Sequence, residues 1–233
     1  MLDALFLTRR RLMIAGGALF SAAKTLPVWA AADTPPANAI SPDEALQRLM
    51  DGNGRYAANK PTVHDYSAGR VARSKAQFPI AAILGCADSR VSPEIVFDQA
   101  LGDLFVVRVA GNTVNVDGIA SLEYAVQFLG VPLIMVLGHS GCGAVAAAVK
   151  VVKENAKLPG HLPELIDSIK PAVVAAALHP NENLTAAATF ENVRQNVNRL
   201  ATNDVLINRF VTEGKVKVVG GVYEIDSGRV TMV

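Results

Sequence analysis

The chain has 233 residues, of which 51% are hydrophobic and 18% are charged, and its 22 basic and 21 acidic residues leave a formal net charge of +1. A balance this close to neutral offers no basic surface for nucleic acid or for an anionic membrane, so we expect neither as a partner. The length is sufficient for an export segment followed by one domain with a well-buried core.

Residues 1–32 are predicted to form a twin-arginine signal peptide. Consecutive arginines at 9–11 precede a short apolar stretch, 12–23, and three alanines at 30–32 form an A-x-A cleavage site. The apolar stretch is too short to span a bilayer comfortably, which favours a signal over a transmembrane helix. An ordinary secretory signal and an uncleaved anchor are the alternatives. Cleavage would leave a single domain, 33–233, with a net charge near −2, in the periplasm or otherwise exported.

The exported domain is expected to begin with a lead-in and a helix. Residues 33–40 are rich in Ala, Pro and Asn and predict a flexible lead-in. At 41–44 the sequence Ser-Pro-Asp-Glu combines a capping serine, a proline suited to the first turn and the glutamate of a capping box. We therefore expect a helix over 41–56, followed by a long loop at 60–75, where the sequence has no clear period.

Three continuous apolar runs follow, each typical of a strand that is buried on both faces. These strands are predicted at 79–85, 104–109 and 132–137. Helices are predicted after each of them, beginning at Ser92-Pro93 and covering 119–129 and 143–152. Strands that alternate with helices indicate an α/β fold in which helices flank both faces of a central parallel sheet.

The C-terminal third of the chain is mostly helical by its pattern. Helices are predicted at 163–178, 185–200 and 204–213. Pro171 lies inside the first of these and is expected to kink or restart it, because proline cannot continue a helix normally. A further strand is predicted at 215–220, and a hairpin at 222–231 would form the C-terminal edge of the sheet.

Two short motifs directly follow two of the predicted strands. The sequence C-A-D-S-R, 86–90, follows the strand at 79–85, and H-S-G-C, 139–142, follows the strand at 132–137. In open parallel sheets, ligands bind beyond the carboxyl ends of the strands, near a reversal of strand order. If the two strands are neighbours, we expect both motifs to reach the same crevice.

The spacing inside each motif suits a metal site. Cys86 and Asp88 are two residues apart, so their side chains point the same way in an extended chain. His139 and Cys142 are three apart, so a single turn brings them together. Thiolate and imidazole are favoured zinc ligands, and two cysteines with one histidine leave a fourth position open. The chain has no other cysteine.

Other interpretations of these residues remain open. Cys86 and Cys142 could form a disulfide, as pairs of cysteines in exported proteins often do. His139 could be a hydrogen-bonded structural residue at a strand end. Asp88 and Arg90 could form only a surface ion pair, which is the usual role of such pairs.

Four segments agree with one known family in order and spacing. They are CADSR (86–90), VVRVAGN (106–112), SLEYAV (121–126) and GHSGCGA (138–144). Together with the flanking elements, which extend the agreement over most of 41–225, they resemble a β-class carbonic anhydrase of the plant-like branch. Ile83 stands where another branch has a tryptophan, which argues against the regulatory bicarbonate pocket of that branch. Val109 departs from the asparagine that many relatives carry.

The resemblance implies the β-carbonic-anhydrase fold and the reversible hydration of carbon dioxide to bicarbonate and a proton, with Zn²⁺ as cofactor. Cys86, His139 and Cys142 would bind zinc, with water or hydroxide as the fourth ligand and nucleophile. Asp88 would orient the hydroxide, and Arg90 would keep this carboxylate ionised. In a closed state, Asp88 could itself be the fourth ligand.

The resemblance also implies a substrate pocket and an oligomer. Gln77, Phe105 and Tyr124 would line the carbon dioxide pocket, with the backbone of Gly143 close to the metal. Gln77 would reach into the site of a partner subunit, because the family forms dimers or multiples of dimers. The helix at 41–56 could wrap around the neighbouring subunit or pack only on its own.

Two other functions remain open at this stage. The same scaffold could hydrolyse carbonyl sulfide or carbon disulfide, which are linear like carbon dioxide. Alternatively, the protein could be a zinc-binding or redox-sensing protein that is not an enzyme. The proton shuttle is not identified, and by chemistry alone the candidates are His64, His161 and His179.

Overall fold

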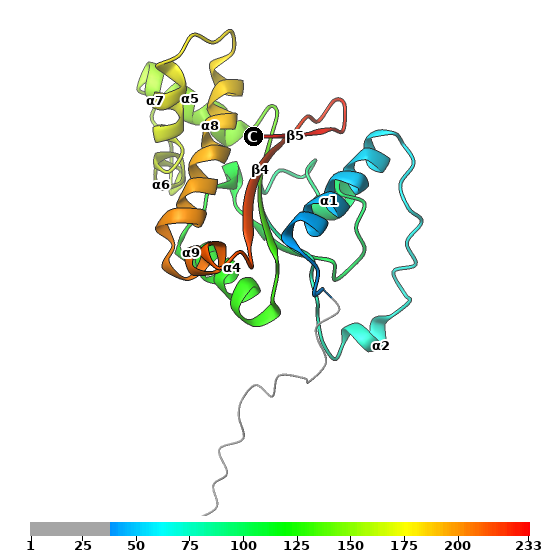
Figure 1. Cartoon of the computed structure of the whole chain (residues 1–233). Coiled ribbons are helices and arrows are strands. Elements are labelled where there is room, and N and C mark those ends of the chain that lie inside the picture. Colours follow the sequence, from blue (N-terminus) through cyan, green and yellow to red (C-terminus); the bar gives the residue numbers. More distant parts are fainter. Residues whose placement is uncertain (1–37) are drawn as a thin grey trace, which may run out of the picture. The chain divides into compact units, whose positions relative to one another are not determined.

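A five-stranded sheet forms the centre of the computed structural model, which describes residues 38–233 (Figure 1). The predicted signal peptide and most of the lead-in lie outside the described residues. The strand order is β2-β1-β3-β4-β5, with β1 at Ala81–Gly85, β2 at Leu104–Arg108, β3 at Leu133–His139, β4 at Lys217–Tyr223 and β5 at Val230–Met232. Strands β1 to β4 are parallel and β5 is antiparallel to β4. The predicted α/β fold with a parallel sheet and an antiparallel C-terminal edge is confirmed.

Strand order reverses at β1. The chain runs from β1 to β2 on one side and then returns to β3 on the other side of β1. The loops after β1 and β3 therefore leave the sheet at a switch point, where open α/β sheets bind ligands. Gly85 pairs with Leu137 in the register of these strands, so Cys86 leaves the sheet close to His139.

Helices cover both faces of the sheet, because alternate residues of each buried strand point to opposite faces. On one face, Leu84 and Val136 belong to a core that includes residues of α4 (Val116–Leu129), α8 (Leu184–Asn198) and α9 (Val205–Thr212). On the opposite face, Ile83 and Met135 share a core with residues of α1 (Pro42–Ala57) and α3 (Pro93–Val96).

A third core lies beyond the carboxyl ends of the strands and contains both cysteines. Cys86 and Cys142 share it with residues of α5 (Gly143–Glu154), α6 (Leu162–Asp167), α7 (Lys170–Ala177) and α8. Figure 1 shows α5, α6 and α7 grouped at one end of α8. The site is therefore buried between the carboxyl edge of the sheet and a helical layer formed by α5 to α8.

Most predicted helices are present, and their ends follow local chemistry. Ser41 caps α1 by accepting a hydrogen bond from the Glu44 amide at 3.1 Å. The helix predicted over 163–178 restarts at proline as expected, because Pro171 lies in the first turn of α7. Within residues 38–233, no helix combines the length and apolar character needed to cross a membrane.

Three details differ from the predictions. The loop predicted over 60–75 contains a short helix, α2 (Arg70–Arg73), and the helix predicted from Ser92 is a single turn, α3. The predicted hairpin is present, since Val222 and Tyr223 pair with Thr231 and Val230. Its first arm is the end of β4, however, and not a strand separate from the one predicted at 215–220. Gly220 lies inside β4, where α8 packs closely against it. A Cβ at Gly220 would lie 2.6 Å from Val193 of α8.

Candidate metal and catalytic site

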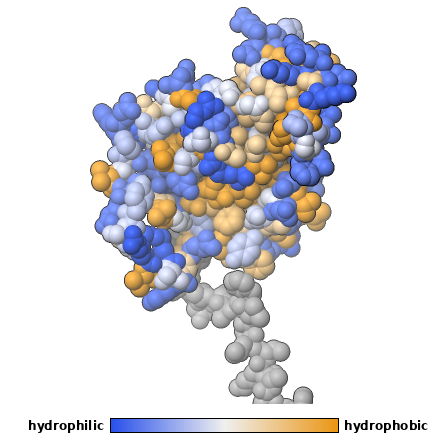
Figure 2. Space-filling view, turned by 180° about the vertical axis from the view of Figure 1, so that it is seen from behind, coloured by the Kyte–Doolittle hydropathy of each residue, from blue (hydrophilic) through white to orange (hydrophobic). Residues whose placement is uncertain are grey.

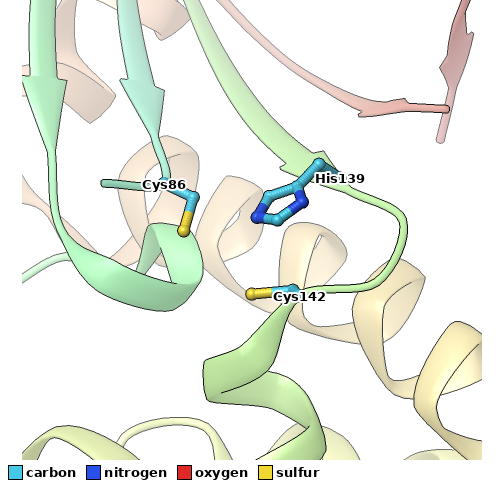
Figure 3. A group of neighbouring side chains, drawn as sticks. All are labelled: Cys86, His139 and Cys142. Carbon is cyan, nitrogen blue, oxygen red and sulfur yellow. The ribbon is translucent and has the colours of Figure 1, made fainter. Parts of the chain in front are cut away.

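Three predicted metal ligands meet at the carboxyl ends of β1 and β3. Cys86 follows β1, His139 is the last residue of β3, and Cys142 is the N-cap of α5. Their ligand atoms all lie within 4.8 Å of one another, and all three side chains are buried (Figure 3). Both cysteines are free, so the structure favours the metal interpretation over the disulfide.

His139 presents a lone pair to the two sulfurs. Its Nδ1 lies 3.0 Å from the Ser140 carbonyl oxygen, and since a carbonyl only accepts, Nδ1 carries the proton. Nε2 is then an acceptor, it is buried, and it has no hydrogen-bond partner of standard geometry among the described residues. A neutral imidazole fixed through its other nitrogen is the usual form of a zinc-bound histidine. The donor set therefore fits zinc, and a purely structural role for His139 leaves Nε2 unexplained.

The sulfur of Cys86 is favoured as a thiolate. A hydrogen bond from Cys142 lowers the pKa of Cys86 far below that of a free thiol, and the same contact raises the pKa of Cys142. The amides of Gly111 and Asp88 also point at the Cys86 sulfur, at 3.2 and 3.4 Å. Burial by itself lowers the pKa of His139, but the adjacent Cys86 outweighs it and the net shift is upward. A bound cation would take the place of the protons that these groups share.

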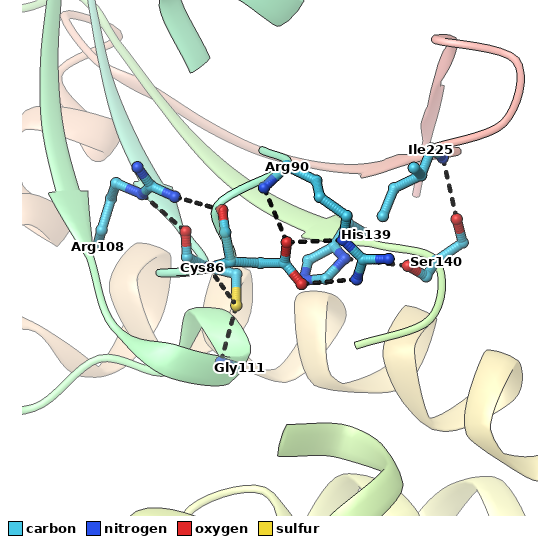
Figure 4. Close-up of polar contacts among 8 residues, drawn as sticks. Cys86, Arg90, Arg108, Gly111, His139, Ser140 and Ile225 are labelled. Atoms are coloured by element: carbon cyan, nitrogen blue, oxygen red, sulfur yellow. Dashed lines mark hydrogen bonds and ion pairs between the residues drawn. The ribbon is translucent and has the colours of Figure 1, made fainter. Parts of the chain in front are cut away.

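Asp88 and Arg90 form a bidentate ion pair at the edge of the ligand group. The guanidinium donates from Nε to Oδ1 at 2.9 Å and from Nη2 to Oδ2 at 2.7 Å (Figure 4). This contact holds the pKa of Asp88 well below its ordinary value. The same Oδ2 lies 3.9 Å from His139 Nε2. Asp88 therefore pairs with arginine here, and its proximity to a metal ligand distinguishes this pair from an ordinary surface ion pair.

Sequence reasoning missed Arg108, which holds the loop that carries Cys86 and Asp88. This arginine ends β2 and donates from Nε to the Cys86 carbonyl at 2.8 Å and from Nη2 to the Asp88 carbonyl at 2.6 Å (Figure 4). The only sequence signal for Arg108 was its position inside the VVRVAGN segment. Its hydrogen-bond acceptors are backbone oxygens, and a pattern of side chains does not predict contacts with the backbone.

The second loop is anchored by Ser140. Its amide donates to the Tyr223 carbonyl at 2.9 Å, and its hydroxyl accepts from the Ile225 amide at 3.0 Å. Both partners belong to the end of β4 and the turn after it. The loop between His139 and Cys142 is thus tied to the neighbouring strand on one side and continues into α5 on the other.

The residues predicted to line the carbon dioxide pocket do not all lie near the metal ligands. Gly143 directly follows Cys142 as the first residue of α5. The rings of Phe105 and Tyr124 are neighbours, with centroids 6.4 Å apart, and both are partly exposed near the edge strand β2. Gln77 is exposed before β1, at the opposite end of that strand from Cys86, beside a cavity of about 690 Å³. Within one chain, Gln77 is not brought to the metal ligands.

Residues 81–230 match the protein family described as carbonic anhydrase. This chain belongs to the carbonic anhydrase family. It is 37% identical over 195 residues to carbonic anhydrase 2 of Mycobacterium tuberculosis, covering 82% of this chain and 93% of the relative. A carbonic anhydrase of Mycolicibacterium smegmatis shows the same identity over the same shares of the two chains.

Solved structures support the β class of the family. The β-carbonic anhydrase CcaA superposes with a TM-score of 0.61 at 28% identity, covering 80% of this chain and 94% of that chain. A Coccomyxa β-carbonic anhydrase in complex with acetazolamide gives a TM-score of 0.62 at 27% identity, covering 82% and 85%. The predicted family is confirmed, while assignment to its plant-like branch stays a prediction.

Proposed function

We propose that the protein is a zinc-dependent carbonic anhydrase that interconverts carbon dioxide with bicarbonate and a proton. The observation that carries this proposal is the buried Cys86, His139 and Cys142 group beside the Asp88–Arg90 pair, in a chain of the carbonic anhydrase family. Bound zinc supplies a Lewis acid that makes water acidic enough to yield a nucleophile near neutral pH.

The chain's own contribution is orientation. Arg90 keeps Asp88 ionised, and an ionised carboxylate only accepts hydrogen bonds. Asp88 can therefore accept a hydrogen bond from a hydroxyl group in the site. This hydrogen bond would orient the lone pair of the hydroxyl oxygen toward carbon dioxide. Because both Asp88 oxygens are held by Arg90, little reorganisation is needed when the reaction occurs.

The test combines metal content with two assays on one sample of purified protein. We expect about one zinc per chain and fast carbon dioxide hydration in a stopped-flow pH-indicator assay. Sulfide release from carbonyl sulfide or carbon disulfide is measured in parallel, because such a hydrolase would share the same ligands. Zinc binding with sulfide release but no hydration would replace the proposed substrate, and a protein without zinc would contradict the proposal altogether.

We also propose that the enzyme works as a homodimer or a multiple of dimers. Strand β2 is an edge strand whose apolar residues, 104–107, remain only partly buried, and an open apolar edge favours pairing with another chain. Figure 2 shows hydrophobic surface gathered on the face opposite the view of Figure 1. In such an assembly, the exposed Gln77 would serve the partner's carbon dioxide pocket. Sedimentation analysis tests this, and an active monomer would contradict it.

We further propose that residues 1–32 direct export by the twin-arginine route. The consecutive arginines at 9–11, the short apolar stretch and the alanines at 30–32 support this proposal. The route carries folded proteins, so zinc could be inserted before export and would protect Cys86 and Cys142 from oxidation in an oxidising compartment.

A further inference from the structure

Helix α8 carries three buried polar residues on the side that faces the site. Thr189, Asn192 and Asn196 are 2%, 1% and 7% exposed. Asparagine and threonine are weak helix formers, and a buried amide is costly unless it is hydrogen-bonded. Two asparagines four residues apart in a buried helix face therefore call for specific partners.

The partners of the two asparagines lie in the segment that follows β2. Asn192 donates from Nδ2 to the Gly111 carbonyl at 2.8 Å. Asn196 accepts at Oδ1 from the Val114 amide at 3.3 Å and donates to the Asn192 carbonyl at 2.8 Å. The pair thus holds both ends of a short segment that is 81 residues away in sequence.

Gly111 joins this network to a metal ligand. Its amide donates to the Cys86 sulfur at 3.2 Å, while its carbonyl accepts from Asn192. The residue has a φ of 76°, and a Cβ there would lie 2.6 Å from Ile169. Only glycine fits at this position, and glycine has the least intrinsic conformational restraint. The direction of its amide must therefore be fixed from outside.

We propose that Asn192 is a positioning residue for the metal centre, because its amide holds Gly111 so that the Gly111 N–H stays aimed at the Cys86 sulfur. An N–H···S hydrogen bond withdraws charge from the thiolate and fixes its direction, and loss of such outer partners typically costs roughly 10- to 100-fold in metal affinity or activity. The inference rests on the proposed zinc centre and extends it to a helix that supplies none of its ligands.

Asn192→Leu tests this, because leucine has a similar size and removes the donor. Thr189→Val is the matched control. Thr189 is buried one turn earlier on α8, and its hydroxyl donates only to the Thr185 carbonyl of its own helix. Asn192→Ala is the second variant if leucine cannot be accommodated in the fold.

Three readouts separate positioning from simple stability. Zinc release to a colorimetric chelator should be roughly 10- to 100-fold faster in the Asn192 variant. The thiolate-to-metal absorption of the cobalt-substituted variant should shift to longer wavelength, because an unbonded thiolate donates charge more readily. The Tm should fall in both Asn192→Leu and Thr189→Val, and Thr189→Val should keep wild-type zinc release and wild-type absorption.

A lower Tm in the Asn192 variant with wild-type zinc release and an unshifted cobalt spectrum would overturn the proposal and leave Asn192 a packing residue. Failure of the zinc centre itself is distinguishable, because wild-type protein would then retain no zinc before any variant is compared.

Discussion

The Arg108 guanidinium donates a hydrogen bond to the backbone carbonyl of Asp88 at 2.6 Å, so the edge strand β2 holds the loop that carries this carboxylate. The same guanidinium donates a second hydrogen bond, to the Cys86 carbonyl at 2.8 Å, and so contacts the loop at two residues. Arg108 itself is exposed, and both of these side-chain hydrogen bonds go to this loop.

We expect Arg108→Lys to reduce kcat/KM for hydration about tenfold, because one ammonium cannot reproduce the fork of a guanidinium and a loosened loop misplaces Asp88. Urea unfolding should show a loss of about 1 kcal/mol in the free energy of unfolding. Arg209→Lys, at an exposed arginine that donates to Gln127 far from the ligands, is the control. Equal rates in the two variants would show that Arg108 does not position the loop.

Asp88→Ala should keep about one zinc per chain and lose hydration activity by roughly 100-fold or more, since a preorganised hydrogen-bonding group at a reacting centre typically contributes about that much. Zinc content and stopped-flow rates on the same sample measure both effects. Glu44→Gln, which breaks the exposed Glu44–Arg48 pair of α1, should change neither. If Asp88→Ala kept full hydration activity, Asp88 would not orient the nucleophile, and absence of hydration in the wild-type protein itself would favour a zinc-binding or redox-sensing centre.

Asp98 provides a test of stability against pH. Burial by itself would raise the pKa of this carboxyl, but hydrogen bonds from Arg55 and from the amide and hydroxyl of Thr62 outweigh it and lower the pKa. His64 also faces it, with Nε2 at 3.4 Å. A carboxyl whose folded pKa lies below the unfolded value, about 3.9, stabilises the fold above that pH, and this stability is lost as pH falls further.

Asp98→Asn should therefore lower the free energy of unfolding by about 2 kcal/mol at pH 7, and its difference from wild type should shrink below about pH 4. Asparagine tolerates the positive φ of 48° at this position, so backbone strain does not contribute. Urea titrations at pH 7 and pH 3.5 measure the effect, with the exposed Asp51→Asn as control. A difference that stays constant with pH would exclude the carboxylate charge as its source.

The sequence predicted those residues of the site that follow strand ends, and it missed those that act through contacts distant in sequence. The strands, Cys86, His139 and Cys142 could be inferred, because apolar runs fix parallel strands and parallel strands end at one edge. Arg108 and Asn192 could not, since each acts on backbone atoms of segments far away in sequence. The full length of β4 was not predicted either, because the close packing of Val193 against Gly220 joins segments that are far apart in sequence.

Export can be tested by fluorescence, because Trp29 is the only tryptophan and lies before the predicted cleavage site. Protein recovered from the exported fraction should begin at Asp33, by N-terminal sequencing, and should show no indole emission when excited at about 295 nm. Replacing Arg9 and Arg10 by lysine should leave unprocessed, tryptophan-containing protein inside the cell. Exported, active protein that retains indole emission would contradict cleavage at this site, and export of the lysine variant would indicate another route.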